Sequence, residues 1–238
     1  MKPFTSSMIT FNRPDGGAVP AYLVEPANPD GAPAIVIIQE WWGLNDQIKG
    51  VAERLAQSGY IALVPDLYRG KATVEEEEAH HLMDALDFGD AASQDIAGAV
   101  AFLKARTNKV AVTGFCMGGA LTLLSLGHIP DLSAAVVWYG FPPAEYLDAS
   151  KITAPILAHW GTQDQFFPAD GVDALEAKLH AAGVTATFHR YLAHHAFANE
   201  TAVGPGRIAN TQFDPAWSQL AWDRTLTFLG RTLWPLPN

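Results

Sequence analysis

The chain has 238 residues, of which 49% are hydrophobic and 17% are charged, and this composition indicates a folded globular protein, not a disordered one. The formal net charge of −10 argues against a nucleic-acid partner and against binding to an anionic membrane surface. The single cysteine excludes an internal disulfide framework and fits a reducing compartment, and no apolar run has the length of a membrane span. We therefore expect one cytoplasmic domain over residues 1–238, as a monomer or a small homo-oligomer.

The first elements along the chain are predicted to form a β-hairpin, with strands at residues 8–11 and 18–24 joined by a Pro-Asp-Gly-Gly turn. After this hairpin, short apolar runs alternate with helical patterns. The run Ala34–Ile38 is continuous and rich in β-branched residues, as expected of a strand that is covered on both faces. Asn45 is placed to cap the helix that follows, and Gly59 is placed to end it.

Several later helices carry sequence signals for their first residues. The segment 73–76, Thr-Val-Glu-Glu, matches a capping box, and Ser93 is expected to cap a helix that ends at Lys104. Asp170 is expected to cap a further helix, and Asp214, which precedes a proline, is expected to cap the last one. The remaining strands are predicted at 60–64, 109–112, 134–138, 156–159 and 186–191, with an ordered loop at 198–213.

This alternation of strands and helices predicts an α/β fold with a mostly parallel central sheet and helices on both faces. No repeat, low-complexity tract or linker interrupts it, so no large separate lid domain is expected. Ligands of such sheets bind at the carboxyl ends of the strands. Polar residues that directly follow a predicted strand are therefore the candidates for a functional site.

The only cysteine, Cys116, stands between two glycines where a predicted strand meets a predicted helix. This arrangement matches the G-x-S-x-G nucleophile elbow, with sulfur in place of the serine oxygen. Gly114 and Gly118 lack Cβ atoms and so permit a crowded turn, while the N-terminus of the next helix favours a thiolate. A lone cysteine can also be a small buried apolar residue. The flanking glycines favour the nucleophile.

Two later strands are followed by residues that would complete such a site. Asp164 follows the strand at 156–159 and His195 follows the strand at 186–191, which gives the order Cys, Asp, His found in α/β-hydrolases. Asp164 would orient the imidazole and His195 would move the proton. Asp164 could instead be a turn aspartate that binds its own backbone. Of the adjacent histidines, His194 and His195, only one is expected to point into the cleft.

A third cluster follows the strand Ala34–Ile38 and contains Glu40 and two tryptophans. The loop at this place in hydrolases supplies one oxyanion-hole N–H, and the residue after the nucleophile supplies the other. The candidates are the backbone N–H groups of Trp41 and Met117. A carboxylate would repel a developing oxyanion, so we interpret Glu40 as acting on the thiol. The alternative is a structural glutamate bound by loop N–H groups.

Neither a metal nor an organic cofactor is expected, because no H-E-x-x-H motif and no ligand-spaced Cys/His pattern occurs. His80 and His81 lie in a predicted helix without a partner at ligand spacing, and we interpret them as surface residues.

Five short motifs occur in order along the chain: Gln39-Glu40-x-x-Gly43, Pro65-Asp66-Leu67-Tyr68, Gly114-Phe115-Cys116-Met117-Gly118-Gly119, Gly161-x-x-Asp164 and His195-Ala196-Phe197. Together they resemble the dienelactone hydrolase family, α/β-hydrolases with a cysteine nucleophile that are also called carboxymethylenebutenolidases. The resemblance implies the α/β-hydrolase fold. It implies Cys116 as the nucleophile, with Asp164 and His195 completing a triad. It also implies that Glu40 controls formation of the thiolate.

The chain departs from the family at two positions. The family enzymes that open dienelactones carry arginines where this sequence has Gly70 and Asn199. Arg69, Lys71 or Arg207 are the residues that could replace them. Without the two arginines that would hold a substrate carboxylate, we expect a substrate that is less charged and bulkier than dienelactone. The residues predicted to bind substrate are Trp42, Tyr68, Arg69, Phe141, Phe167, Phe197 and Asn199.

A sulfur nucleophile also restricts the substrate. The reference pKa of a thiol, about 8.5, lies far below that of an alkanol, so a tetrahedral intermediate readily expels the thiolate again. Hydrolysis then needs a good leaving group or a well-placed proton. We expect a hydrolase of activated small-molecule esters or lactones that uses a Cys-His-Asp triad and a thioester acyl-enzyme. The alternatives are a promiscuous aryl-ester, thioester or phosphoester hydrolase without dienelactone activity, a redox-sensing thiol, and a non-catalytic ligand-binding protein.

Overall fold

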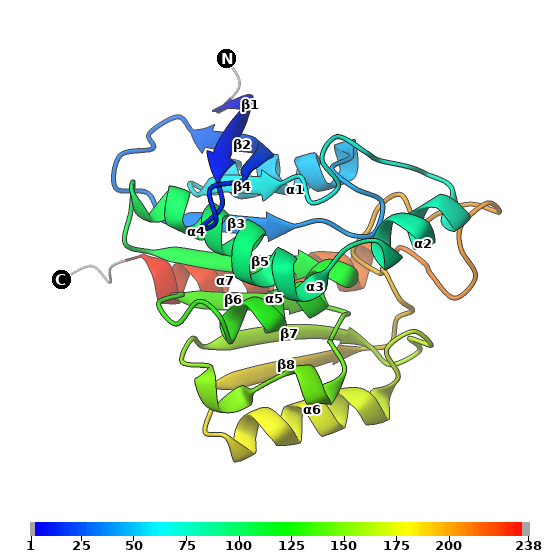
Figure 1. Ribbon diagram of the computed structural model, residues 1–238. Helices are drawn as coiled ribbons and strands as arrows, with labels where there is room; N and C mark the ends of the chain where they lie inside the picture. The colour runs from blue at the N-terminus through cyan, green and yellow to red at the C-terminus, as the bar shows by residue number, and fades with distance from the viewer. Residues whose placement is uncertain (1–2, 235–238) are drawn as a thin grey trace.

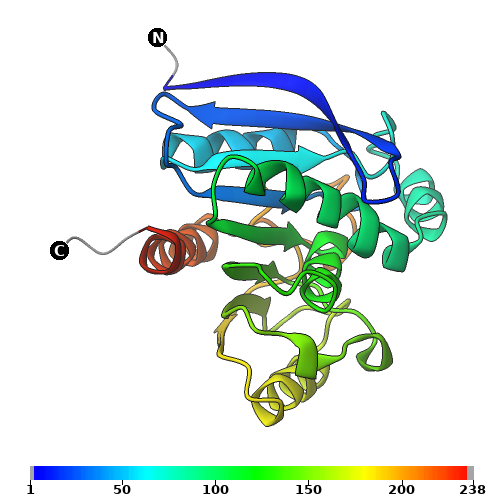
Figure 2. The same cartoon turned by 60° about the vertical axis from the view of Figure 1, so that its left-hand side comes forward.

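An eight-stranded sheet forms the centre of the computed structural model, which describes residues 3–234 (Figures 1 and 2). The strands are β1 (Phe4–Asn12), β2 (Ala18–Pro26), β3 (Ala34–Ile38), β4 (Ile61–Pro65), β5 (Val110–Phe115), β6 (Ala134–Trp138), β7 (Ile156–Gly161) and β8 (Ala186–Tyr191). Their order in the sheet is β1-β2-β4-β3-β5-β6-β7-β8. β1 and β2 form an antiparallel hairpin, β2 also pairs antiparallel with β4, and all other pairs are parallel. The predicted hairpin and mostly parallel sheet are confirmed.

Helices cover both faces of this sheet (Figure 2). They are α1 (Asp46–Gln57), α2 (Glu76–Asp84), α3 (Phe88–Asp90), a π-helical turn (Ala91–Ile96), α4 (Ala97–Lys104), α5 (Met117–Leu126), α6 (Ala169–Ala181) and α7 (Pro215–Leu233), with 3₁₀ turns at Ala144–Tyr146 and Ala149–Lys151. α1 and α7 pack on one face, and α4, α5 and α6 pack on the other. No helix within residues 3–234 is long and apolar enough to span a membrane.

The strand β3 shows why the apolar runs are continuous. Its residues Ala34, Val36 and Ile38 face the core beneath α4 and α5. Ile35 and Ile37 face the second core, beneath α1 and α7. Because successive side chains of a strand point to opposite faces, a strand between two helical layers must be apolar at every position.

Two of the predicted helix caps are confirmed. The Asn45 side chain accepts a hydrogen bond from Ile48 N at 3.1 Å, so it satisfies one free N–H of the first turn of α1. The carboxylate of Asp214 accepts from two N–H groups of α7 at 3.0 Å, and Pro215 follows as the first helical residue.

Three other predicted caps are wrong. Thr73 accepts a hydrogen bond from Glu75 N at 3.0 Å, but α2 begins only at Glu76, so the Thr73 turn ends before the helix starts. Ser93 lies inside the π-helical turn, and the segment is capped earlier, by Asp87. Asp170 lies in the first turn of α6 and accepts from the N–H of the next residue. Thr73 and Asp170 thus satisfy a nearer N–H than the one predicted, and the Ser93 hydroxyl instead donates to the Gly89 carbonyl, one turn back.

The carboxyl ends of the parallel strands lie at one edge of the sheet, and this arrangement places the candidate residues. Glu40 follows β3, Cys116 follows β5, Asp164 follows β7 and His195 follows β8. Among the described residues, no separate domain stands between these loops and the sheet.

Candidate active site

Cys116 lies between β5 and α5 in a strained turn. Its φ of 53° and ψ of −116° fall where residues other than glycine are rarely found. Its N–H donates to Trp138 O at 3.0 Å, and its carbonyl accepts from Gly119 N at 2.8 Å and from Ala120 N at 3.2 Å. These backbone bonds hold the conformation. The sulfur thus sits at the N-terminal, positive end of α5, where a thiolate is favoured.

The glycines around Cys116 are required by close backbone approach. A Cβ on Gly114 would collide with the carbonyl of Gly118, and a Cβ on Gly118 would lie 2.6 Å from the Gln39 carbonyl. Gly140, which sequence reasoning did not single out, would collide with the carbonyl of Cys116 itself. Three loops therefore meet at this turn with no space for a side chain.

Asp164 and His195 form a buried pair. His195 is 4% exposed and Asp164 is 6% exposed, and Nδ1 of His195 lies 2.7 Å from Oδ2 of Asp164. The second oxygen, Oδ1, accepts from the N–H groups of Phe166 and Phe167 at 2.8 and 2.9 Å. Asp164 is thus both the turn aspartate and the partner of the histidine, because each oxygen serves one role.

The charge of His195 depends on its neighbours. Burial lowers its pKa, but the negative charge of Cys116 and the hydrogen bond to Asp164 outweigh this effect and raise the pKa to about 10. While the sulfur carries this negative charge, the imidazole is protonated at neutral pH and can donate a proton. His194 is only half-buried and does not line the cavity, and its Nδ1 has no hydrogen-bond partner among residues 3–234.

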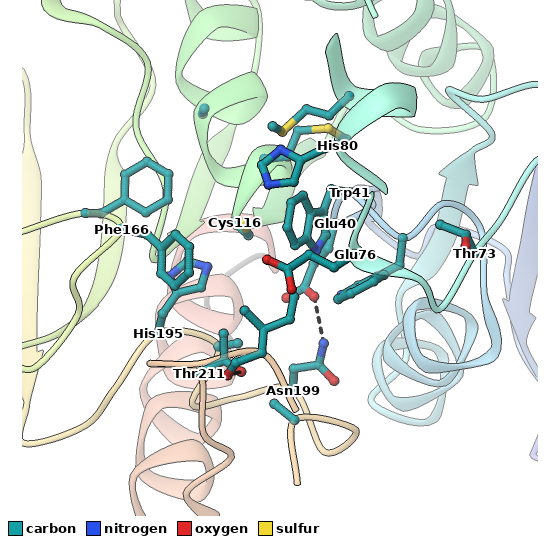
Figure 3. Close-up of a pocket in the computed structure, with 18 of the residues that line it drawn as sticks. Glu40, Trp41, Thr73, Glu76, His80, Cys116, Phe166, His195, Asn199 and Thr211 are labelled. Atoms are coloured by element: carbon teal, nitrogen blue, oxygen red, sulfur yellow. Dashed lines mark hydrogen bonds between the residues drawn. The ribbon is translucent and has the colours of Figure 1, made fainter. Parts of the chain in front are cut away.

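Glu40 is 4% exposed and points toward the same space as Cys116 (Figure 3). The Tyr139 hydroxyl donates to its Oε1 at 3.2 Å, and the Asn199 amide donates to its Oε2 at 2.6 Å. Burial raises the pKa of Glu40, while the charge of His195 and these two hydrogen bonds oppose the rise. Among the described residues, both hydrogen bonds to its carboxylate come from side chains and none comes from a loop N–H.

The two oxyanion-hole candidates both line the cavity. Met117 is the first residue of α5, whose first-turn N–H groups have no acceptor inside the helix. Trp41 lies in the turn after β3, and its N–H donates to no other residue in the described part of the chain.

A cavity of about 1280 Å³ opens above these residues. Of the predicted substrate-binding residues, Trp42, Phe141, Phe167 and Asn199 line it. Figure 3 shows His195 and Phe166 on one side of Cys116, with Glu40 and Trp41 on the other.

Three predicted substrate-binding residues lie outside this cavity. Tyr68 is buried, and its hydroxyl contacts the Met117 sulfur at 3.3 Å. Arg69 pairs with the buried carboxylate of Asp95 at 2.7 Å and donates to the Asp66 carbonyl at 2.8 Å. Phe197 is fully buried in the apolar core. The structure therefore gives no support to these three assignments.

Sequence reasoning also missed lining residues, among them His80. It is exposed, yet its ring meets the Trp41 ring edge-on at 4.7 Å and lines the cavity. The available signal was helical spacing, since Glu76, His80 and Met83 share one face of α2 and all three line the cavity. The described residues hold no group of three or more histidine, cysteine or acidic side chains that could bind a metal ion.

The sequence of this chain is similar to a known protein family and to several of its members. The family model for the dienelactone hydrolase family matches residues 19–233. The chain belongs to this family, and it is therefore a hydrolase. It is 34% identical over 235 residues to the protein usf of Aquifex pyrophilus, covering 93% of this chain and 96% of that one. It is also 34% identical to an Escherichia coli protein provisionally named carboxymethylenebutenolidase, covering 76% of this chain and 74% of that one.

Solved structures agree with the family assignment. A Klebsiella pneumoniae protein provisionally named dienelactone hydrolase superimposes with a TM-score of 0.83 at 27% identity, covering 96% of this chain and 99% of that one. A dienelactone hydrolase-like promiscuous phosphotriesterase from metagenomic libraries gives a TM-score of 0.86 at 22% identity, over 98% and 100% of the two chains. The latter likeness shows the shared α/β-hydrolase fold.

We predict that Cys116→Ala lowers the pKa of His195 from about 10 toward the usual histidine range, because the negative sulfur is removed while burial remains. The measurement is an NMR pH titration of the isotope-labelled imidazole. The control, His194→Ala, leaves Cys116 in place and should reproduce the wild-type titration. An unchanged His195 titration in Cys116→Ala would show that the sulfur carries no charge felt by the ring.

Proposed function

We propose that this protein is a cysteine-nucleophile hydrolase of activated esters and lactones, working through Cys116, His195 and Asp164. The observation that carries the proposal is the strained Cys116 turn, at a cavity also lined by His195, which Asp164 orients at 2.7 Å. A redox-sensing thiol would need no such proton shuttle, and the chain has no second cysteine to resolve a sulfenic acid. We place the activity in the cytoplasm as part of this proposal, since a chain whose single cysteine is free fits a reducing compartment.

In this mechanism the sulfur of Cys116 attacks the substrate carbonyl. The N–H groups of Trp41 and Met117 stabilise the oxyanion of the tetrahedral intermediate. His195 gives its proton to the departing oxygen, which leaves a thioester on Cys116. Water then attacks the thioester carbonyl and gives a proton to His195. The bond from carbon to sulfur breaks, which releases the carboxylic acid and leaves Cys116 as a thiolate. Asp164 keeps Nδ1 occupied, so that the other ring nitrogen, Nε2, faces the reaction.

Glu40 supplies the control of the sulfur in this proposal. Its burial beside the cavity disfavours a free carboxylate, and Tyr139 and Asn199 hold it in place. A carboxylate here opposes a second negative charge on sulfur in the resting enzyme. When substrate enters and displaces Tyr139 and Asn199 from Glu40, the Glu40 carboxylate can accept the proton of the Cys116 thiol. Attack is then coupled to binding.

The decisive experiment compares wild type with Cys116→Ala on aryl esters. We expect a loss of at least about 10³-fold in kcat/KM, by analogy with removal of a triad nucleophile. Wild type should also show an acyl adduct on Cys116 by mass spectrometry when mixed rapidly with substrate. Circular dichroism checks that the variant is folded, and a folded variant that keeps most of its activity would disprove the nucleophile assignment. Phosphotriesters are assayed in parallel, since a promiscuous phosphotriesterase shares this fold.

We predict opposite outcomes for the adjacent histidines. His195→Ala should lower kcat/KM by about 10³-fold, because the proton donor and base is lost. His194→Ala should stay within about threefold of wild type, because that side chain does not line the cavity. Steady-state kinetics with one aryl ester measures both variants. A reversal of the two phenotypes would show that the wrong histidine had been assigned.

We predict that Glu40→Gln slows acylation by at least about tenfold, because a proton acceptor is lost. Alkylation of Cys116 by iodoacetamide should extend to lower pH, because the carboxylate no longer opposes a negative sulfur. Rapid-mixing kinetics and the pH profile of inactivation measure the two effects. The matched control is Glu53→Gln, which removes a glutamate that also accepts a tyrosine hydroxyl hydrogen bond, from Tyr22 at 2.9 Å, but lies outside the cavity. If the acylation rate and the pH profile of inactivation of Glu40→Gln both match those of wild type, Glu40 does not control the ionisation of Cys116.

A further inference from the structure

Large apolar side chains are left uncovered at the cavity. Phe166 is 47% exposed, Tyr146 is 70% exposed and Val74 is 84% exposed, and all three line the cavity. Exposing apolar surface costs free energy in proportion to its area, so a cluster of such residues around a reactive group indicates a surface that a ligand covers.

Aromatic rings are concentrated on the His195 side of the cavity. The ring of Phe166 lies 4.9 Å from the imidazole of His195, and the ring of Phe167 lies 5.6 Å from it. Phe141, in the loop after β6, meets Phe167 edge-on at 5.1 Å, and the same loop continues to Tyr146. Phe141, Phe166 and Phe167 thus stand beside the proton donor, and together with Tyr146, which lines the same cavity from the Phe141 loop, they are called the aromatic wall.

The opposite side of Cys116 has a different character. Trp41 lies there (Figure 3), and the edge-on contact with His80 places α2 on the same side. Val74 lies in the segment that leads into α2. This side also holds the Trp41 N–H that is proposed to bind the carbonyl oxygen.

The proposed chemistry fixes which part of the substrate each side receives. When the tetrahedral intermediate collapses, the bond from carbon to the departing oxygen breaks and the carbonyl re-forms. That oxygen takes the proton from His195, and the acyl group stays on sulfur. The departing group must therefore lie within hydrogen-bond reach of His195, on the side of the aromatic wall.

We propose that the aromatic wall is the leaving-group pocket, which makes esters of phenols and of bulky aromatic alcohols the preferred substrate class, while the Val74 side receives the acyl chain. This assignment rests on the proposed function. Aromatic rings stack offset or edge-on against such a wall, and a larger departing ring covers more of Phe166 and Tyr146.

The test compares kcat/KM for naphthyl acetate and phenyl acetate, whose departing alcohols have similar acidity but different area. Phe166→Ala and Tyr146→Ala should each lower the naphthyl-to-phenyl ratio by about fivefold. The ratio of phenyl hexanoate to phenyl acetate, which varies only the acyl chain, should stay as in wild type in both variants. Val74→Ala should lower the hexanoate ratio instead.

The matched control is Leu192→Ala, which truncates a side chain that is 66% exposed but lies outside the cavity, and both ratios should be unchanged. A merely structural role of Phe166 would lower both acetates equally and leave the ratio intact. An unchanged naphthyl-to-phenyl ratio, or a loss in the hexanoate ratio instead, would overturn the leaving-group assignment. Failure of the proposed function is distinguishable, because Cys116→Ala would then still hydrolyse phenyl acetate.

Discussion

The close packing of backbone around Cys116 is the constraint on which the site depends. Gly114, Gly118 and Gly140 bring β5, α5 and the loop after β6 into direct contact, with no room for a Cβ. This contact holds Cys116 at a positive φ that its own side chain disfavours. The strain is sustained by two parallel strand pairings on either side of β5, with β3 and β6. A buried sheet thus supplies the rigidity with which one sulfur is presented to a cavity.

The site also buries three ionisable side chains close to one another. Glu40, Asp164 and His195 are each at most 6% exposed; Glu40 and His195 line the cavity together with Cys116, and Asp164 holds His195 from behind. The charge of His195 opposes the raised pKa of Glu40, and the hydrogen bond to Asp164 helps to raise the pKa of His195. The protonation states of Glu40 and His195 are therefore coupled. Entry of a substrate changes the surroundings of both groups together.

The fold and the proposed chemical centre were predictable from the sequence because both rest on local patterns. Continuous apolar runs marked most of the strands between helical layers, and Glu40, Cys116 and Asp164 each stand close behind one, while His195 follows the more polar strand Ala186–Tyr191. The pocket was predicted less well because side-chain direction inside a loop depends on distant partners. Arg69 turns to Asp95, which is 26 positions away, and His80 reaches the cavity only because α2 packs against Trp41. The Arg69 contact leaves no trace in nearby sequence, and the helical spacing that groups His80 with Glu76 and Met83 does not show which surface that face of α2 meets.

The way in which Asp164 is held has a consequence for how this site can vary. The aspartate is anchored by the main-chain N–H groups of Phe166 and Phe167, not by their rings. The geometry of the Asp164–His195 pair is therefore indifferent to which side chains occupy these two positions, provided that neither is proline. The same short loop keeps the carboxylate fixed and displays two side chains beside His195. Substrate range can change here by single substitutions, whereas an insertion in the loop would misplace the acid.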